Sequence, residues 1–239
     1  ILNQISVEKF EKLSDKFMEC GIDGNRDLVT RTVRMIVMKA QLEEHFCFMY
    51  ADLCRKIIDV WTQRDEENAP LAAAEATDMA DMPLGKYFRN MLLLICEEEF
   101  LLDRVAGLAE IEAMEMPTDE KEEKILVYRK RYLGHMRFIG EVFIKDLVKY
   151  SIMLRCIDTL SESTEEDSLA CLCKLMQTIG AKLEDLAGGR SKVRDALDRL
   201  FSTLAERAKD SASFSSRIRF MFKDLIDLRA NFWVSRQDQ

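Results

Sequence analysis

Few side chains in this 239-residue sequence could carry out catalysis. His45 and His135 are the two histidines and lie far apart in the sequence. A lone histidine on a helix is more often a surface or hydrogen-bonded residue than a general base. Cys171 and Cys173 cannot share a metal ion from one helix, because residues i and i+2 point about 200° apart. Without a Gly-rich phosphate loop or a Gly-x-Ser-x-Gly turn, the sequence predicts no catalytic residue, no metal site and no cofactor.

The cysteine content indicates where the protein works. Seven cysteines are an odd number with no pairing pattern, which favours reduced thiols in a cytosolic or nuclear compartment, and we expect a cytoplasmic protein.

The longest apolar stretches, such as 91–95, fall far short of the ~20 residues of a membrane helix, so no membrane contact is expected. Because the sequence begins at Ile1, we expect it to be part of a longer protein.

Charge is distributed unevenly along the chain. The net charge is -8, but residues 59–82 hold seven acidic residues against Arg64, and residues 97–123 hold eleven against Arg104 and Lys121. By contrast, residues 124–155 carry eight basic residues against two acidic ones, and residues 189–239 carry eleven against seven. A basic stripe that binds RNA is therefore one interpretation, and solvated helix faces are the other.

The elements that position these residues are helices. Apolar residues recur at helical spacing in nine segments: 10–17, 29–40, 46–57, 88–95, 132–143, 153–160, 169–183, 193–204 and 218–228. Only three prolines and nine glycines interrupt them, too few for an all-β fold. We therefore predict an all-α chain, a single domain over 1–239, built as an α-solenoid of about five HEAT-type hairpins. A globular helical bundle is the alternative.

The breaks between these segments also make predictions. All three prolines lie in or beside the acidic segments, so the acidic spacers near 62–82 and 104–120 are expected to be loop-like. Gly21 and Gly24 could adopt positive φ, and the Gly188-Gly189 pair could reverse the chain. Ser163 to Glu166 has the pattern of a capping box.

Two segments, 133–143 and 215–229, make more specific predictions about side-chain contacts than the rest of the sequence. Residues 133–143 place Gly134 and Gly140 within a helix, where each costs roughly 1 kcal/mol relative to Ala, so we expect a close helix contact at one of them. In residues 215–229, Phe220 falls between the inner and outer faces, and periodicity alone favours packing over a role as an interface anchor. The expected core stripe is Ile218, Met221, Leu225 and Leu228. The charged residues that this stripe leaves off the core are Arg217, Arg219 and Lys223.

These two segments resemble the middle domain of eukaryotic translation initiation factor 4G. The block Ser-Ser-Arg-Ile-Arg-Phe-Met at 215–221 matches the pattern of that family residue for residue, and Leu-Gly-x-x-Arg-Phe-Ile-Gly-Glu-x-Phe at 133–143 matches it closely. Further blocks follow in order along the whole chain: 1–10, 50–54, 88–100, 165–180 and 227–233. The likeness is weakest at 22–25 and 62–82, and the spacer at 97–123 differs in detail.

The resemblance implies a HEAT-repeat scaffold, not an enzyme. It would bind the DEAD-box RNA helicase initiation factor 4A, orient its two domains and stimulate its ATPase and unwinding activity while mRNA is recruited to the ribosome. Other initiation factors would bind through regions outside this chain. The helicase-binding positions carried over are Leu2, Ile5, Phe10 and Phe220, to which we add Arg217, Arg219 and Lys223 from their charge and shared face.

The sequence leaves two other functions open. The chain could bind mRNA weakly and without sequence specificity through Arg129, Lys130, Arg131 and Arg137, if these residues form one connected face. Alternatively, it could be a HEAT-repeat RNA-binding or adaptor module of mRNA decay or nuclear cap-binding complexes. The match at 215–221 favours the translation factor over this alternative.

Overall fold

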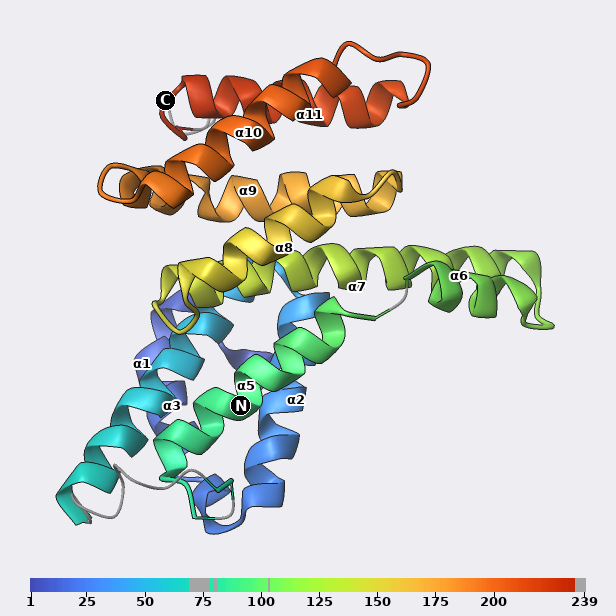
Figure 1. Cartoon of the computed structure of the whole chain (residues 1–239). Helices are drawn as coiled ribbons and strands as arrows, with labels where there is room; N and C mark the ends of the chain where they lie inside the picture. The colour runs from blue at the N-terminus through green and yellow to red at the C-terminus, as the bar shows by residue number, and fades with distance from the viewer. Residues whose placement is uncertain (69–77, 80, 103, 235–239) are drawn as a thin grey trace. The chain divides into compact units, whose positions relative to one another are not determined.

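The computed structural model describes residues 1–68, 78–79, 81–102 and 104–234. All regular secondary structure in these ranges is helical, which confirms the predicted all-α fold (Figure 1). The chain folds into two compact units, residues 1–138 and residues 139–239. Helix α7 contributes to both units, because it runs from Thr118 to Ile144.

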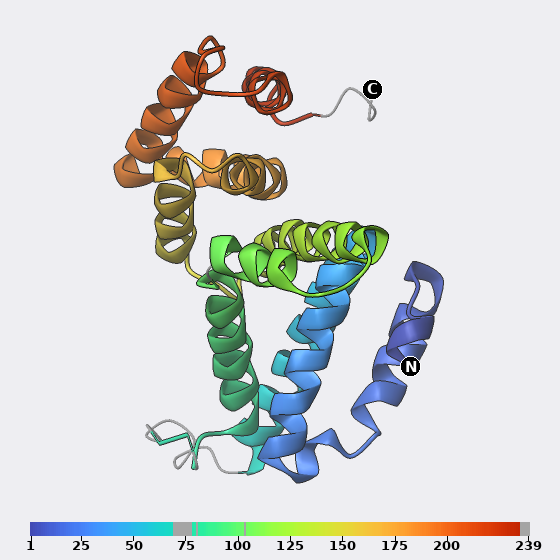
Figure 2. The same cartoon turned by 90° about the vertical axis from the view of Figure 1, so that its right-hand side faces the viewer.

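The first unit is built around three long helices. These are α2 (Arg26–Leu42), α3 (Cys47–Asn68) and α5 (Leu84–Phe100), and each packs against the other two. Figure 2 shows α2 and α5 running alongside each other. Helix α1 (Phe10–Met18) packs on α3, and α6 (Arg104–Ala113) lies beside the N-terminal half of α7. Short 3-10 turns occupy Leu2–Gln4, Val7–Lys9, Ile22–Gly24 and Glu44–Phe46.

Apolar contacts and close backbone approaches hold this unit together. Trp61 and Phe88 are buried edge to face, with ring centroids 5.6 Å apart. Gly85 lets the start of α5 approach α3 closely, since a Cβ there would lie 2.7 Å from the backbone nitrogen of Thr62. A Cβ at Gly134 would likewise collide with the backbone carbonyl of Gln41. The expected close contact at Gly134 is therefore confirmed.

The second unit contains the C-terminal part of α7 and four further helices. These are α8 (Tyr150–Glu162), α9 (Glu166–Ala187), α10 (Ser191–Arg207) and α11 (Ser216–Ala230). Helix α9 packs against α8, α10 and α11 and is buried on several sides. Cys171 and Cys173 both lie in the core for this reason, as expected of small apolar residues. Gly140 is also a close-contact position, because a Cβ there would lie 2.8 Å from the Thr178 side chain.

The structure corrects the expectation for the acidic spacers. Residues 104–113 form α6, and α7 already begins at Thr118, so most of the 104–120 spacer is helical. Ala, Leu and Glu have high helix propensity, and Asp119 and Glu120 lie in the first turn of α7, where they interact favourably with the helix dipole. In the 62–82 spacer, α3 continues to Asn68, while residues 69–77 and 80 lie outside the described residues.

Two predicted helix ends also differ. The capping box at 163–166 does not form: the Ser163 hydroxyl accepts a hydrogen bond from the Glu165 backbone N–H at 3.1 Å, and α9 begins only at Glu166. This short-range bond satisfies the N–H donor before the helix starts. Gly21 has the expected left-handed conformation with φ of 69°, whereas Gly24 does not have a positive φ. The Gly188-Gly189 pair lies between the end of α9 at Ala187 and the start of α10 at Ser191, where the chain turns back and α10 packs on α9, as expected.

Candidate functional site

Helix α11 is fixed at its N-cap residue by hydrogen bonds to another helix. The Ser215 hydroxyl caps α11 by accepting from the Ile218 N–H at 3.5 Å. The Ser215 N–H and hydroxyl donate to the Glu166 carboxylate at 2.7 and 2.8 Å, and these bonds lower the pKa of Glu166. The start of α11 is thereby tied to the first residue of α9, which sets the position of the side chains that follow.

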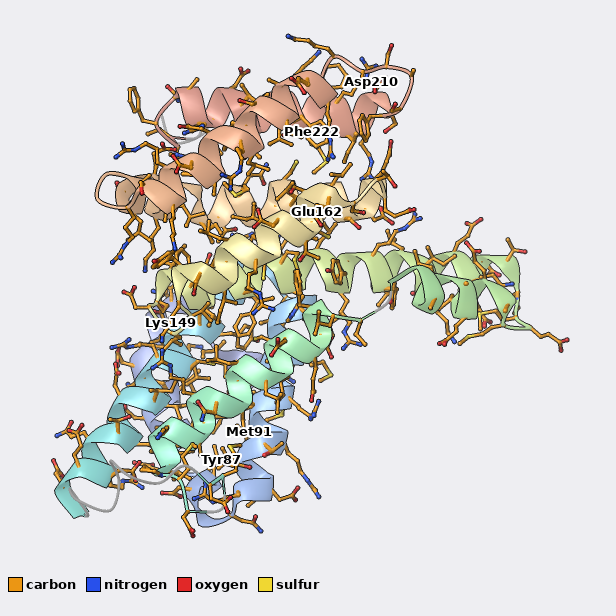
Figure 3. All side chains as sticks on the ribbon, viewed as in Figure 1. Tyr87, Met91, Lys149, Glu162, Asp210 and Phe222 are labelled. Atoms are coloured by element: carbon orange, nitrogen blue, oxygen red, sulfur yellow. The ribbon has the colours of Figure 1, made fainter. Side chains whose placement is uncertain are left out.

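The buried side of α11 differs from the predicted stripe. Ile218, Phe222 and Leu225 are fully buried, whereas Met221 and Leu228 are only half-buried. Spacing i, i+4, i+7 describes this face as well as the predicted i, i+3, i+7 does, so periodicity could not choose between them. The choice comes from packing against α9 and α10. Phe222, labelled in Figure 3, lies edge to face with Phe214, with ring centroids 5.9 Å apart.

Phe220 is on the outer side of α11. Its side chain is 61% exposed, so the expectation of a packing role is wrong. The Lys223 ammonium lies 5.4 Å from the centre of the Phe220 ring, and Arg217 lies 3.6 Å from the Asp167 carboxylate. The Arg219 guanidinium is 3.3 Å from the Ser216 hydroxyl. We call Arg217, Arg219, Phe220 and Lys223 the α11 surface.

The chemistry of the α11 surface suits a protein partner better than a reaction. An exposed aromatic ring between cations can enter an apolar pocket while the cations meet carboxylates around it. The ion pair of Arg217 with Asp167 is solvent-exposed, and such pairs typically contribute about 0–1 kcal/mol. Arg217 can therefore be recruited by a partner at little cost.

The N-terminal candidates are placed differently from the expectation. Leu2 and Ile5 are 6% and 7% exposed, and Phe10 is half-buried. The 3-10 turn at Leu2–Gln4 buries Leu2 in the first unit, and Ile5 follows it into the core. In this region Val7 is the apolar residue that is exposed, at 69%. Leu2 and Ile5 therefore act as packing residues in the isolated chain.

The four RNA-binding candidates do not share one free basic face. Arg131 donates to both carboxylate oxygens of Glu99, at 2.8 and 2.7 Å, and to the side-chain oxygen of Gln41 at 2.7 Å. Arg137 lies 3.5 Å from Glu44. Arg129 and Lys130 are exposed on α7. Two of the four charges are thus balanced by carboxylates within the first unit.

The two histidines fit the structural interpretation. His45 is exposed, whereas His135 is buried and hydrogen-bonds to Gln41 at 3.2 Å and to the Cys96 carbonyl at 3.0 Å. Burial lowers the pKa of His135 to about 4, so the ring is neutral at pH 7.

Within the described ranges, no three His, Cys, Asp or Glu side chains come close enough to hold a metal ion. Nor does any described helix have the length and apolarity needed to cross a bilayer.

Two sequence blocks that are distant along the chain meet in the second unit. The ring of Trp233 packs directly over Gly180, where a Cβ would overlap the indole. Arg229 donates to Glu184 at 2.9 and 3.0 Å and lies 4.5 Å from the centre of the Phe201 ring. The blocks at 165–180 and 227–233 therefore meet where the C-terminal end of α11 packs on α9.

Comparisons with known proteins agree with this architecture. A model of the MIF4G domain matches residues 1–231. Translation initiation factor 4G from rice is 33% identical over 253 residues, which covers 99% of this chain and 12% of that protein. Mouse translation initiation factor 4 gamma 3 is 31% identical over 250 residues, which covers 99% of this chain and 14% of that protein. The chain thus spans a small part of these relatives.

A solved structure supports the fold independently. The MIF4G domain of the Trypanosoma cruzi translation initiation factor EIF4G5 superposes with a TM-score of 0.54 and 16% sequence identity. The match covers 97% of this chain and 93% of that one, so the likeness in fold extends along nearly the whole length of both. The match of the domain model to residues 1–231 shows that the chain belongs to the MIF4G domain family.

Proposed function

We propose that this domain is a translation initiation scaffold that binds the DEAD-box helicase initiation factor 4A through the α11 surface. Membership of the MIF4G family and the likeness to initiation factors 4G support a role in initiation. The observation that carries the choice of surface is Phe220, which is 61% exposed and has the Lys223 ammonium 5.4 Å from the centre of its ring. The proposal assigns the protein to the cytoplasm and assigns it no catalytic step.

The mechanism is preorganisation of a two-domain partner. A scaffold that contacts both helicase domains reduces the number of relative orientations that they sample, so more encounters are productive. ATP turnover and unwinding then accelerate, although every reacting group belongs to the helicase. The cations of the α11 surface would speed association with an acidic helicase surface, and this contribution would fall as salt rises.

A binding experiment with the purified helicase tests this proposal. Phe220→Ala should raise the dissociation constant by about 30-fold, which corresponds to the ~2 kcal/mol of an interface anchor. Arg217→Glu together with Lys223→Glu should weaken binding strongly at low salt. Far-UV circular dichroism should be unchanged, because these side chains are exposed.

Matched controls come from other exposed positions. Phe46→Ala removes a phenylalanine that is 43% exposed in the first unit, and Arg199→Glu reverses an exposed charge on α10. Both should leave affinity and ATPase stimulation unchanged. Unaltered binding by Phe220→Ala and by the charge reversal would exclude the α11 surface as the contact. Absence of any binding by the wild-type domain would reject the helicase as its partner.

Direct RNA binding is a weaker proposal. With Arg131 and Arg137 held in ion pairs, we expect only weak, salt-sensitive and sequence-independent binding of mRNA. Titrating a fluorescent single-stranded RNA at two salt concentrations measures it. Sequence-selective, salt-insensitive binding would instead favour an RNA-binding or adaptor module of another mRNA complex.

A further inference from the structure

The hairpin formed by α6 and the N-terminal half of α7 has little core of its own. No residue between 106 and 131 is buried. Helix α6 contacts one side of α7: a Cβ at Gly107 would collide with the Tyr128 hydroxyl, and the Lys121 ammonium donates to the Glu112 carbonyl at 2.7 Å. The opposite side of α7 faces solvent, as the exposure of Leu126 shows.

This opposite side carries exposed apolar residues. Leu126 is 66% exposed and Val127 is 46% exposed. A rotation of 100° per residue places acidic residues on the same face one to two turns before Leu126, and Lys130 about one turn after it. We define the outer face of α7 as Asp119, Glu122, Glu123, Leu126, Val127 and Lys130, none of which is buried.

The charges of the outer face are separated into blocks. Solvated helices commonly gain stability from opposite charges three or four residues apart. Glu122 has no basic residue at either spacing, and Lys130 has no acidic residue at either spacing. The face therefore runs from negative through apolar to positive, with Leu126 midway between Glu122 and Lys130.

We propose that a second copy of this chain docks antiparallel on the outer face of α7, with the two-fold axis at Leu126. In that arrangement Leu126 meets its symmetry mate, and Glu122 of each copy faces Lys130 of the other. Such a self-complementary contact is what a two-fold dimer requires. A polyanion such as RNA fits less well, because Asp119, Glu122 and Glu123 would repel its phosphates. The inference does not depend on the proposed function.

The length of helix in the proposed contact limits the expected affinity of the dimer. The outer face, from Asp119 to Lys130, spans about 18 Å of helix, at about 1.5 Å per residue. One helix pair of this length falls at the small end of specific interfaces, so we expect a dissociation constant on the order of tens of micromolar. Sedimentation equilibrium from about 1 to about 500 µM covers this range.

The apolar centre is tested by one substitution and its control. Leu126→Glu should weaken dimerisation by roughly tenfold or more, because the two-fold axis brings the introduced carboxylates of both copies together at the centre of the contact. Leu28→Glu replaces a leucine that is 46% exposed on α2 and should leave the dimer unchanged. Both chains should keep wild-type circular dichroism. Equal effects of the two substitutions, or a wild-type chain that stays monomeric throughout, would overturn the proposal.

The charge pattern gives a test that does not depend on folding effects at Leu126. Glu122→Lys alone should weaken the dimer, since the introduced ammonium would face Lys130 of the other copy, and Lys130→Glu alone should weaken it in the same way. An equimolar mixture of the two variants should restore association, because each contact then joins opposite charges. Failure of the mixture to associate better than either variant would refute the antiparallel register and the proposed pairing.

Discussion

Phe220 and Phe222 lie two residues apart on α11, yet the structure predicts opposite consequences for replacing them. Phe222 is fully buried and pairs edge to face with Phe214, so Phe222→Ala leaves a cavity and removes an aromatic contact. Burial at this level predicts a loss of about 4 kcal/mol in the free energy of unfolding of the second unit. Phe220 is mostly exposed and lies 5.4 Å from the Lys223 ammonium, so Phe220→Ala should cost less than about 1 kcal/mol.

Urea unfolding separates the two positions, and the two tryptophans make the assay specific to each unit. Trp61 lies in the first unit and Trp233 in the second, so a Trp61→Phe background leaves the indole fluorescence as a reporter of the second unit. The midpoint should fall strongly for Phe222→Ala and little for Phe220→Ala, with helicase affinity showing the reverse order. A loss below about 1 kcal/mol for Phe222→Ala, or equal losses for both variants, would show that α11 does not bury the face that carries Phe222.

Three further predictions concern the first unit. Burial lowers the pKa of His135 to about 4 from about 6.5, so the unfolded chain binds more protons than the folded chain between these pH values. The free energy of unfolding should therefore fall by about 3 kcal/mol as pH drops from 6.5 to 4. In urea unfolding, His135→Gln should flatten that pH dependence. Gly134→Val should destabilise by more than about 2 kcal/mol through its clash with the α2 backbone, whereas Gly24→Ala, with open space around it, should change the melting temperature little. Ile5→Ala should lower the unfolding free energy by about 2–3 kcal/mol without changing the helicase affinity of the folded chain. Val7→Ala, at an exposed neighbouring site, should leave stability unchanged. Reduced helicase affinity at full stability for Ile5→Ala would instead place this segment in the binding site.

The sequence was sufficient for the fold class and for the positions of most helices. Eight of the nine segments with helical apolar spacing lie wholly within α-helices, and the segment 46–57 begins one residue before α3, because an amphipathic period directly reflects burial on one face. The close contacts at Gly134 and Gly140 were also foreseeable, since glycine within a helix is costly unless a neighbour needs the space. The helix over 104–113 was missed because its short, acidic sequence has high helix propensity but no apolar period, and propensity alone is a weak signal.

The candidate site depended on tertiary structure at the level of single side chains. The sequence placed cations and an aromatic residue on 217–223 and could not say which phenylalanine faced outward, because two helical registers differing by one residue fit the same apolar positions. Packing of α11 against α9 and α10 selected Phe222 for the core and left Phe220 exposed. The same holds at the N-terminus and on α7, where Leu2 and Ile5 became buried and Arg131 was paired with Glu99. Burial and ion pairing of a given residue depend on elements distant in sequence, so the local pattern determined the helices while their packing determined which side chains remain available to a partner.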